Sequence, residues 1–160
     1  MRWRLVAIAI GLFGSVISVP AAPAQQAPTR EDTLAELHAI QMKLSRATEG
    51  NIQVLRSFQF NLTLAAICLN DVNNIQDEVE GQLNRLERLS RIQGKLPSLD
   101  DVFARLIETE AEVAIDGIGS KRKRIQLSMR VCGSVPIVVS RAQLALSMLG
   151  EVESALLRLK

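Results

Sequence analysis

The two cysteines, Cys68 and Cys132, are the residues whose chemistry is easiest to place in this chain of 160 residues. They are far apart in the sequence and form no Cys-x-x-Cys motif, which argues against a thiol oxidoreductase. An even number of cysteines in an exported chain favours a disulfide, which would close a long loop and stabilise the fold by about 4 kcal/mol in the chain-entropy model. The alternative is two buried free thiols, each packed as a small apolar side chain.

His38 is the only histidine, and nothing around it completes a catalytic or metal-binding set. It has no cysteine pair or Glu-x-x-His partner nearby for a metal, and the chain has no nucleophile-elbow motif for a serine hydrolase. We interpret His38 as a surface or boundary residue. The sequence therefore predicts no catalytic residue, no metal ligand, no cofactor and no enzymatic activity.

Oxygen-bearing side chains gather along two stretches. The members of the first are Asn70, Asp71, Asn73, Asn74, Asp77, Glu78 and Glu80. They lack the glycine-centred spacing of an EF-hand loop, so calcium binding is not predicted. The second stretch holds Glu108, Glu110 and Glu112, whose spacing does not match that of di-iron bundles. Both stretches are typical of the solvated face of a helix.

A run of basic residues is the one candidate contact site, and it comprises Lys121, Arg122, Lys123 and Arg124. Such a run could contact a protein partner, a phosphate or a lipid headgroup. Its position after two glycines favours a solvated, flexible turn instead.

Residues 1–24 have the pattern of a secretory signal peptide. A short basic start is followed by an uncharged apolar run, Leu5 to Val19, and then by small residues at Ala22 and Ala24. As a helix this run would reach only about 22 Å, short of the roughly 30 Å core of a bilayer, which argues against the alternative of an uncleaved anchor. We expect cleavage after Ala24 and a periplasmic or secreted protein.

The exported chain, residues 25–160, is predicted to be one helical domain with a flexible lead at residues 25–29. Removal of Arg2 and Arg4 leaves 17 of the 19 basic residues, which balance the 17 acidic ones. A neutral chain has no general attraction to nucleic acid or to an anionic membrane. The few remaining aromatic side chains are poor equipment for stacking on bases. We expect no nucleic-acid partner, and the net charge does not indicate membrane contact.

The longest periodic stretch runs from Leu55 to Ile92 and predicts one long amphipathic helix. Its positions three and four residues apart are Leu55, Phe58, Leu62, Ala65, Leu69, Val72, Gln76, Val79, Leu83 and Leu86. All of them except Gln76 are apolar. The middle of the helix is predicted to be buried all round because it has a second apolar set, Phe60, Leu64 and Ile67.

A helix over residues 30–48 is predicted before this stretch, with Thr29 or Asp32 as its cap. Gly50 costs up to about 1 kcal/mol inside a helix, so a break or kink is expected there. The pattern alone does not decide whether residues 30–48 and 51–93 form one continuous helix.

Strands are the competing interpretation at two places. Residues 57–64 and 125–131 alternate apolar and polar side chains, as half-buried strands do. Because the two cysteines lie just beyond these runs, they could join a small pair of strands. The helix is favoured because the heptad continues through the first run and no hairpin-turn signal flanks it.

Gly94 and Pro97 are predicted to end the long helix. The next helix would be capped by Ser98, stop at Gly117 and Gly119, and bury its apolar residues Leu99, Phe103, Leu106 and Ile107. A short helix is predicted after the basic run and before Gly133.

The last helix is predicted to start with Ser134 as cap and Pro136 in its first turn. Its apolar seam repeats every four and three residues at Val138, Ala142, Ala145, Leu149, Val152, Leu156 and Leu159. We expect it to pack antiparallel along the long helix.

These patterns predict an all-α fold, a compact helical bundle of four to five helices with one long heptad-patterned helix, pinned by Cys68–Cys132. We expect a non-enzymatic exported protein that mediates protein–protein interaction or assembly in the cell envelope or periplasm. Its partner would be another envelope protein or a second copy of itself, because the wide apolar faces exceed what the chain can cover. The alternative function is a carrier of a lipid-like or apolar small molecule, with Met129 and Met148 lining a cavity.

Overall fold

The structure is a computed structural model that describes residues 28–57 and 63–160. Its four long helices are α1 (Arg30–Ser57), α2 (Thr63–Gln93), α3 (Asp100–Val131) and α4 (Pro136–Leu157). A single 3-10 turn, η1 (Pro97–Leu99), lies between α2 and α3. The described ranges contain no strand. The predicted all-α bundle is confirmed, while the predicted signal peptide lies outside the described residues.

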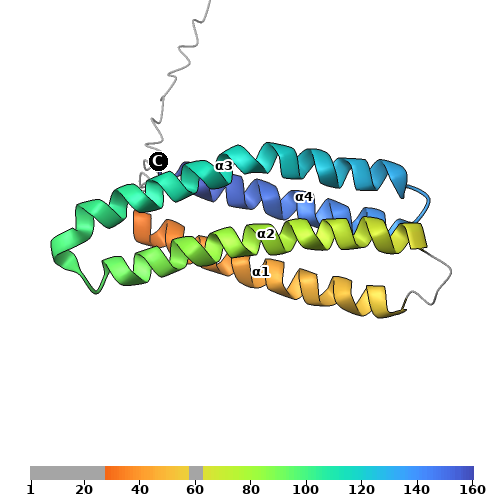
Figure 1. Cartoon of the computed structure of the whole chain (residues 1–160), viewed down its shortest axis with the longest axis horizontal. Helices are drawn as coiled ribbons and strands as arrows, with labels where there is room; N and C mark the ends of the chain where they lie inside the picture. Colours follow the sequence, from red (N-terminus) through yellow and green to blue (C-terminus); the bar gives the residue numbers. More distant parts are fainter. Residues whose placement is uncertain (1–27, 58–62) are drawn as a thin grey trace, which may run out of the picture.

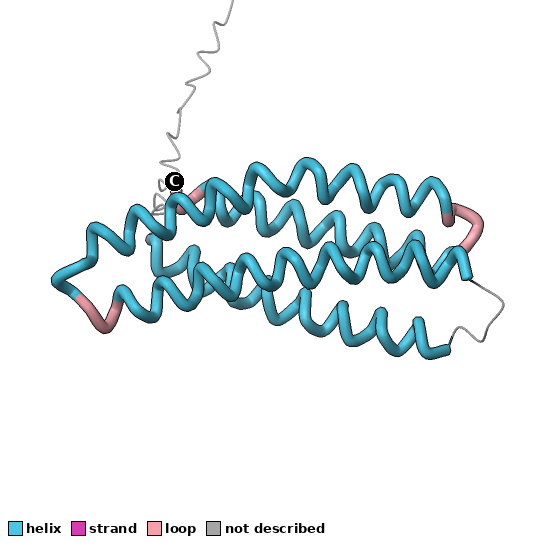
Figure 2. The backbone as a smooth tube through the Cα atoms, viewed as in Figure 1, coloured by secondary structure: helices cyan, strands magenta, loops and turns pink. Residues whose placement is uncertain are grey.

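The helices lie side by side and alternate in direction (Figure 1). The short turn regions at the two ends of the bundle join α2 to α3 and α3 to α4 (Figure 2). Because each connection reverses the chain, α4 runs parallel to α2 and antiparallel to α3 and α1. The predicted antiparallel packing of the last helix on the long helix is therefore wrong.

The start of α1 confirms the predicted cap. The backbone N–H of Asp32 donates to Thr29 Oγ1 at 3.1 Å, and the backbone N–H of Thr29 donates back to Asp32 Oδ2 at 2.9 Å. The Thr29 hydroxyl and backbone bonds lower the pKa of the Asp32 carboxyl, because they stabilise its ionised form.

Gly50 does not break α1, contrary to the prediction, and the helix continues to Ser57. A Cβ at position 50 would lie 3.0 Å from Arg141 Nη1, so the glycine makes room for the guanidinium of a residue on α4. The predicted long helix is instead divided, since Leu55 belongs to α1 and α2 begins at Thr63. Residues 58–62, which include part of the predicted heptad, are outside the described residues.

Both strand alternatives are removed as far as the chain is described. Residues 125–131 lie in α3, and residues 63 and 64 lie in α2. The heptad of α2 is confirmed from Ala65 to Leu86, where every seam position is buried. The predicted burial all round is wrong, since Leu64 and Ile67 are 54% and 60% exposed.

Gly117 and Gly119 do not end a helix, because α3 is one continuous helix of 32 residues. A Cβ at position 117 would lie 3.0 Å from Lys121 Nζ, so the glycine leaves space for that side chain. Two predicted helices are thus one, which explains why the described residues hold four helices rather than five.

The predicted caps of the last two helices are wrong. The residues at the cap positions are Leu99 for α3 and Val135 for α4, and neither cap makes a side-chain hydrogen bond. Pro136 does occupy the start of α4, as predicted. The predicted seam of the last helix is confirmed, since all seven of its positions are buried; six lie on α4, and Leu159 follows the end of the helix.

The main hydrophobic core lies between the four helices and includes residues from each of them. A second, smaller core surrounds the cysteines and contains Ala65, Cys68, Leu69, Cys132 and Val138. Two amide pairs join α1 to α2 in the interior. Asn51 Nδ2 donates to Gln76 Oε1 at 2.7 Å, and both of these residues are buried. Gln41 Nε2 donates to Asn84 Oδ1 at 2.7 Å, with Gln41 buried and Asn84 partly buried.

Candidate interaction surface

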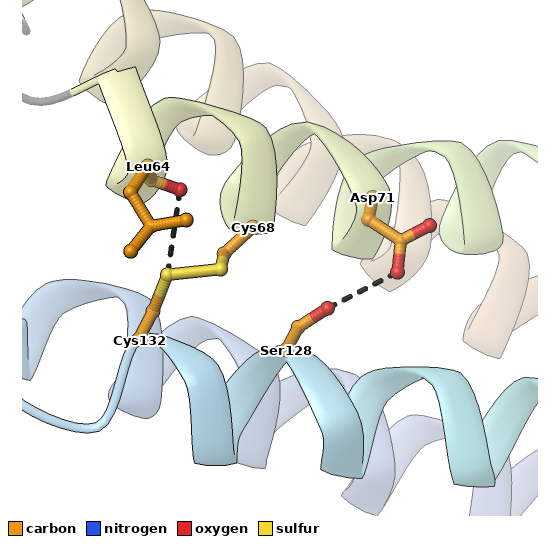
Figure 3. Close-up of a disulfide and its surroundings, with 5 residues drawn as sticks. All are labelled: Leu64, Cys68, Asp71, Ser128 and Cys132. Carbon is orange, nitrogen blue, oxygen red and sulfur yellow. Dashed lines mark hydrogen bonds between the residues drawn. A yellow bond between two sulfur atoms is a disulfide. The ribbon is translucent and has the colours of Figure 1, made fainter.

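Cys68 and Cys132 form a disulfide between α2 and α3, as predicted, with their Cα atoms 6.5 Å apart (Figure 3). The alternative of two free thiols is wrong. Sγ of Cys132 lies 3.3 Å from the Leu64 carbonyl oxygen, a contact without a proton to donate because the sulfur is oxidised. One turn further along, the Ser128 hydroxyl donates to Asp71 Oδ2 at 3.1 Å.

The basic run continues this set of links between α2 and its neighbours. Arg124 donates to Asp71 Oδ1 at 2.7 Å and to Glu78 Oε1 at 3.2 Å, and these bonds raise the pKa of its guanidinium. Lys121 is buried, with Nζ 3.8 Å from Glu78 Oε2. The disulfide and these pairs therefore hold α2 and α3 in one register.

The flexible-turn interpretation of Lys121 to Arg124 is wrong, because all four residues lie in the middle of α3. Arg122 pairs with Glu153 of α4 at 2.6 Å, so the run reaches both helices that flank α3. Lys123 is exposed and makes no ion pair with another described residue. Contact with an external anion stays a prediction, and Lys123 is the residue placed to make it.

His38 lies at the edge of a groove of about 240 Å³ between α1 and α2. Its Nδ1 is 3.5 Å from Glu87 Oε1, and Arg91 donates to the same carboxylate oxygen at 2.5 Å. Among the described residues no group of three histidine, cysteine or carboxylate side chains could hold a metal ion. His38 is therefore an exposed residue, as the sequence predicted, and it lies beside the Glu87–Arg91 ion pair.

Large apolar side chains are exposed around the turn between α2 and α3 and along the first half of α3. Each of them is between 42% and 54% exposed. They are Ile92, Leu96, Leu99, Val102, Leu106 and Val113. We call this set the hairpin surface. Every residue from 94 to 102 is exposed. The predicted burial of Leu99 and Leu106 is therefore wrong, although Ile107 beside them is fully buried as predicted.

Two features of the fold leave the hairpin surface uncovered. The ends of α2 and α3 extend past the start of α1 and the end of α4 (Figure 1). In addition, α1 packs on another side of α2, through Leu83 and Leu86, which line the groove that contains His38. On the side of α2 away from α1, the Ile92 side chain is 42% exposed.

The hairpin surface is hollowed by two neighbouring grooves. One, of about 390 Å³, lies between Leu89 of α2 and Leu106 of α3 and is edged by arginine and glutamate side chains. The other, of about 420 Å³, lies along α3 beside Val102 and Leu106. Because Leu106 and Thr109 line both grooves, the two grooves form one connected concave strip. A strip of this form accommodates the ridge of another helix.

The signal for this surface was present in the sequence. Leu99, Val102, Leu106, Thr109 and Val113 repeat at intervals of three and four residues, as a helix seam does. A second seam on α3, which includes Ile107, Ala111 and Ala114, is the one that is buried. Because Leu106 and Ile107 are adjacent in the sequence, the two seams were predicted as one buried face.

A smaller group of exposed apolar side chains lies on α2 and α3 near the disulfide, at the other end of the bundle from the α2–α3 turn. Its members are Leu64, Ile67, Leu127 and Val131, all at least half exposed. Leu64 and Ile67 closely follow residues 58–62 in the sequence, which are outside the described residues. The hairpin surface is therefore the better-defined candidate.

Comparison with known protein families, curated proteins and solved structures gives no match to this chain. Among the helices of residues 28–57 and 63–160, none is both long and apolar enough to span a membrane. The fold and the hairpin surface are therefore the observations on which a functional proposal can rest.

Proposed function

We propose that this protein is a non-enzymatic helical-bundle protein that mediates protein–protein interaction or assembly through the hairpin surface. The observation that carries the proposal is the exposed seam on α3, with Ile92 and Leu96 beside it. Exposed apolar residues are common when scattered, but a contiguous group bordered by charged side chains is typical of an interaction site.

The apolar side chains of the hairpin surface are incompletely buried in the isolated bundle. Moving a Val, Leu or Ile side chain from water to a full apolar environment is favourable by about 1.5–3 kcal/mol. The side chains of the hairpin surface are each about half exposed, so the isolated bundle realises only part of that free energy. A partner that covered them would gain the rest, less the cost of association.

Export to the cell envelope is part of the proposal. The basic and apolar leader at residues 1–24 supports it, as does the pairing of both cysteines in a disulfide. Disulfides persist in oxidising compartments and are rare in the cytosol of mesophiles. The mass of the purified protein tests this, because cleavage after Ala24 would remove the leader.

The carrier function stays a prediction without a specific observation in its favour. Met148, considered for a cavity wall, is packed inside the main core, and Met129 packs against the same core. The grooves described above open to the surface rather than into the core.

A matched pair of substitutions tests the proposed function. Leu106 on α3 and Leu144 on α4 are 45% and 44% exposed, so Leu106→Gln and Leu144→Gln remove similar apolar areas from different faces. The full chain would be expressed with its leader in its host and isolated gently with whatever is bound in fixed ratio. We expect Leu106→Gln to lose that bound protein and Leu144→Gln to keep it. Equal behaviour of the two variants would contradict an interaction at the hairpin surface.

A further inference from the structure

Helix α1 buries a more polar set of residues than α4, although both helices contribute to the main core. The seven buried residues of α1 include three polar ones, Thr33, Gln41 and Asn51. The eight buried residues of α4 are all apolar. Because burial of apolar surface is the main favourable term in packing, α1 gains less free energy from docking than α4 does.

Buried side-chain atoms without a hydrogen-bond partner occur only on α1 and α2, in the part of the chain that the structure describes. Four are on α1 and two on α2, and they are Arg30 Nε, Gln41 Oε1, Thr48 Oγ1, Asn51 Oδ1, Asn73 Oδ1 and Gln76 Nε2. Each has given up hydrogen bonds to water without replacing them, which is unfavourable. Separation of α1 from α2 would return the α1 atoms to water and so recover part of that free energy.

The links among the other three helices are stronger than those of α1. The disulfide joins α2 to α3 covalently, and a short turn joins α3 to α4. Both cysteines of the chain lie outside α1, so no disulfide holds this helix. Its ion pairs with the last part of the chain, Lys43 with Glu151 and Glu36 with Arg158, are exposed. Exposed pairs of this kind contribute little to stability.

We infer that α1 detaches from the bundle in a local opening, while α2, α3 and α4 stay folded as one disulfide-linked unit. This inference does not depend on the hairpin surface or on its partner. Parts of one domain open with different free energies, and a part with fewer buried apolar side chains and weaker links opens more readily. Helix α1 combines both properties with buried polar atoms that regain water when it leaves.

Opening of α1 would uncover a second apolar surface. Leu37, Ile40 and Leu44 are each at most 3% exposed in the closed bundle and pack into the main core. They would become accessible together with the core side chains of α2 and α4, the two helices on which α1 packs. The closed bundle therefore conceals an apolar surface that only the open form presents to a partner.

Amide hydrogen exchange of the purified protein, followed residue by residue by NMR, would test the opening. We expect the slowest amides of α1, around Ile40 and Leu44, to exchange at least about thirtyfold faster than the slowest amides of α2 and α4. Urea should accelerate exchange in α1 less steeply, because the local opening exposes less surface than global unfolding does. Equal rates with equal urea dependence would overturn the inference, since the four helices would then open together.

The same substitution on two helices separates local opening from global unfolding. Ile40 on α1 and Ile125 on α3 are both fully packed in the main core, and α1 packs far less on α3 than on α2 and α4. Ile125→Val weakens the unit that stays folded, so it should accelerate exchange in α2 and α4 by roughly threefold to tenfold and leave α1 unchanged. Ile40→Val weakens the docking of α1 and should accelerate exchange in all the helices. If Ile125→Val accelerates α1 as much as α2, then α1 does not open separately and the inference fails.

Discussion

Helices α4 and α3 both carry apolar side chains at intervals of three and four residues, yet the two seams have opposite fates. On α4 the seam from Val138 to Leu156 is at most 2% exposed at every position. On α3 the seam that contains Val102, Leu106 and Val113 is about half exposed. The same periodicity therefore describes a helix buried in its own bundle and a helix face left for another molecule.

The difference lies in how many faces each helix has to cover. One side of α4 faces the core and receives side chains from its neighbours in the bundle. Helix α3 has two apolar faces, of which only the one with Ile107 and Ile118 meets the core. Since the bundle covers one face of α3, the second needs a cover from outside or stays in water.

The largest expected effect concerns the Cys68–Cys132 disulfide, which holds α3 in register with α2. Replacing both cysteines with alanine should lower the free energy of unfolding by about 4 kcal/mol, because the disulfide closes a long loop in the unfolded chain. Urea unfolding of the variant, compared with the oxidised parent, measures this. A loss well under about 1 kcal/mol would show that α2–α3 packing sets the register without the disulfide.

The comparison between the seams is tested directly by one substitution in each. Leu149→Ala in the α4 seam should cost roughly 2–5 kcal/mol, since it leaves a cavity in a closed core. Leu106→Ala on the exposed seam should cost only about 0.5 kcal/mol in the isolated monomer. Urea unfolding at protein concentrations low enough to exclude association measures both. Similar losses would mean that α3 is covered within its own bundle.

The buried amide pair offers a test of how the core tolerates polarity. Asn51→Ala should destabilise the fold by about 1–3 kcal/mol, because it leaves the buried amide of Gln76 without its partner. Replacing both residues, as in Asn51→Leu with Gln76→Met, should cost much less or even stabilise. Thermal unfolding of the single and the double variant measures both losses of stability. A small loss in the double variant would mean that the core tolerates the amide pair without needing it for stability. Equal losses in the single and double variants would contradict this account.

The smallest effect expected is electrostatic. Burial, reinforced by the nearby carboxylates of Asp77 and Glu49, raises the pKa of Glu80 above its ordinary value of 4.5. Its ionised form is therefore less favourable in the folded state, and the protein loses stability as pH rises through that raised pKa. Glu80→Gln should stabilise at pH 7 by about 0.3 kcal/mol or less and give no gain near pH 4. Thermal unfolding at the two pH values checks this, and an equal gain at both would point to a cause other than charge.

Much of the architecture could be predicted from residue patterns. The heptad of Leu69 to Leu86, the α4 seam and the cysteine pair each appear in the structure as expected. The failures occurred at glycines and at adjacent apolar residues. Gly50 and Gly117 lie inside helices, and a Cβ at either position would lie 3.0 Å from the side chain of Arg141 or Lys121. The first of these contacts joins α1 to α4, so no local pattern contains it, whereas the second lies within one turn of α3.

The candidate surface shows the same limit. By itself the sequence determined that α3 is apolar on more than one side and that α4 has a continuous seam, because spacing along a helix sets which residues share a face. Only the tertiary structure decided which face is covered, because covering depends on which side of α3 turns toward the other helices. Ile107 faces the core and is fully buried, whereas Leu106, adjacent to it at the same level of α3, is 45% exposed.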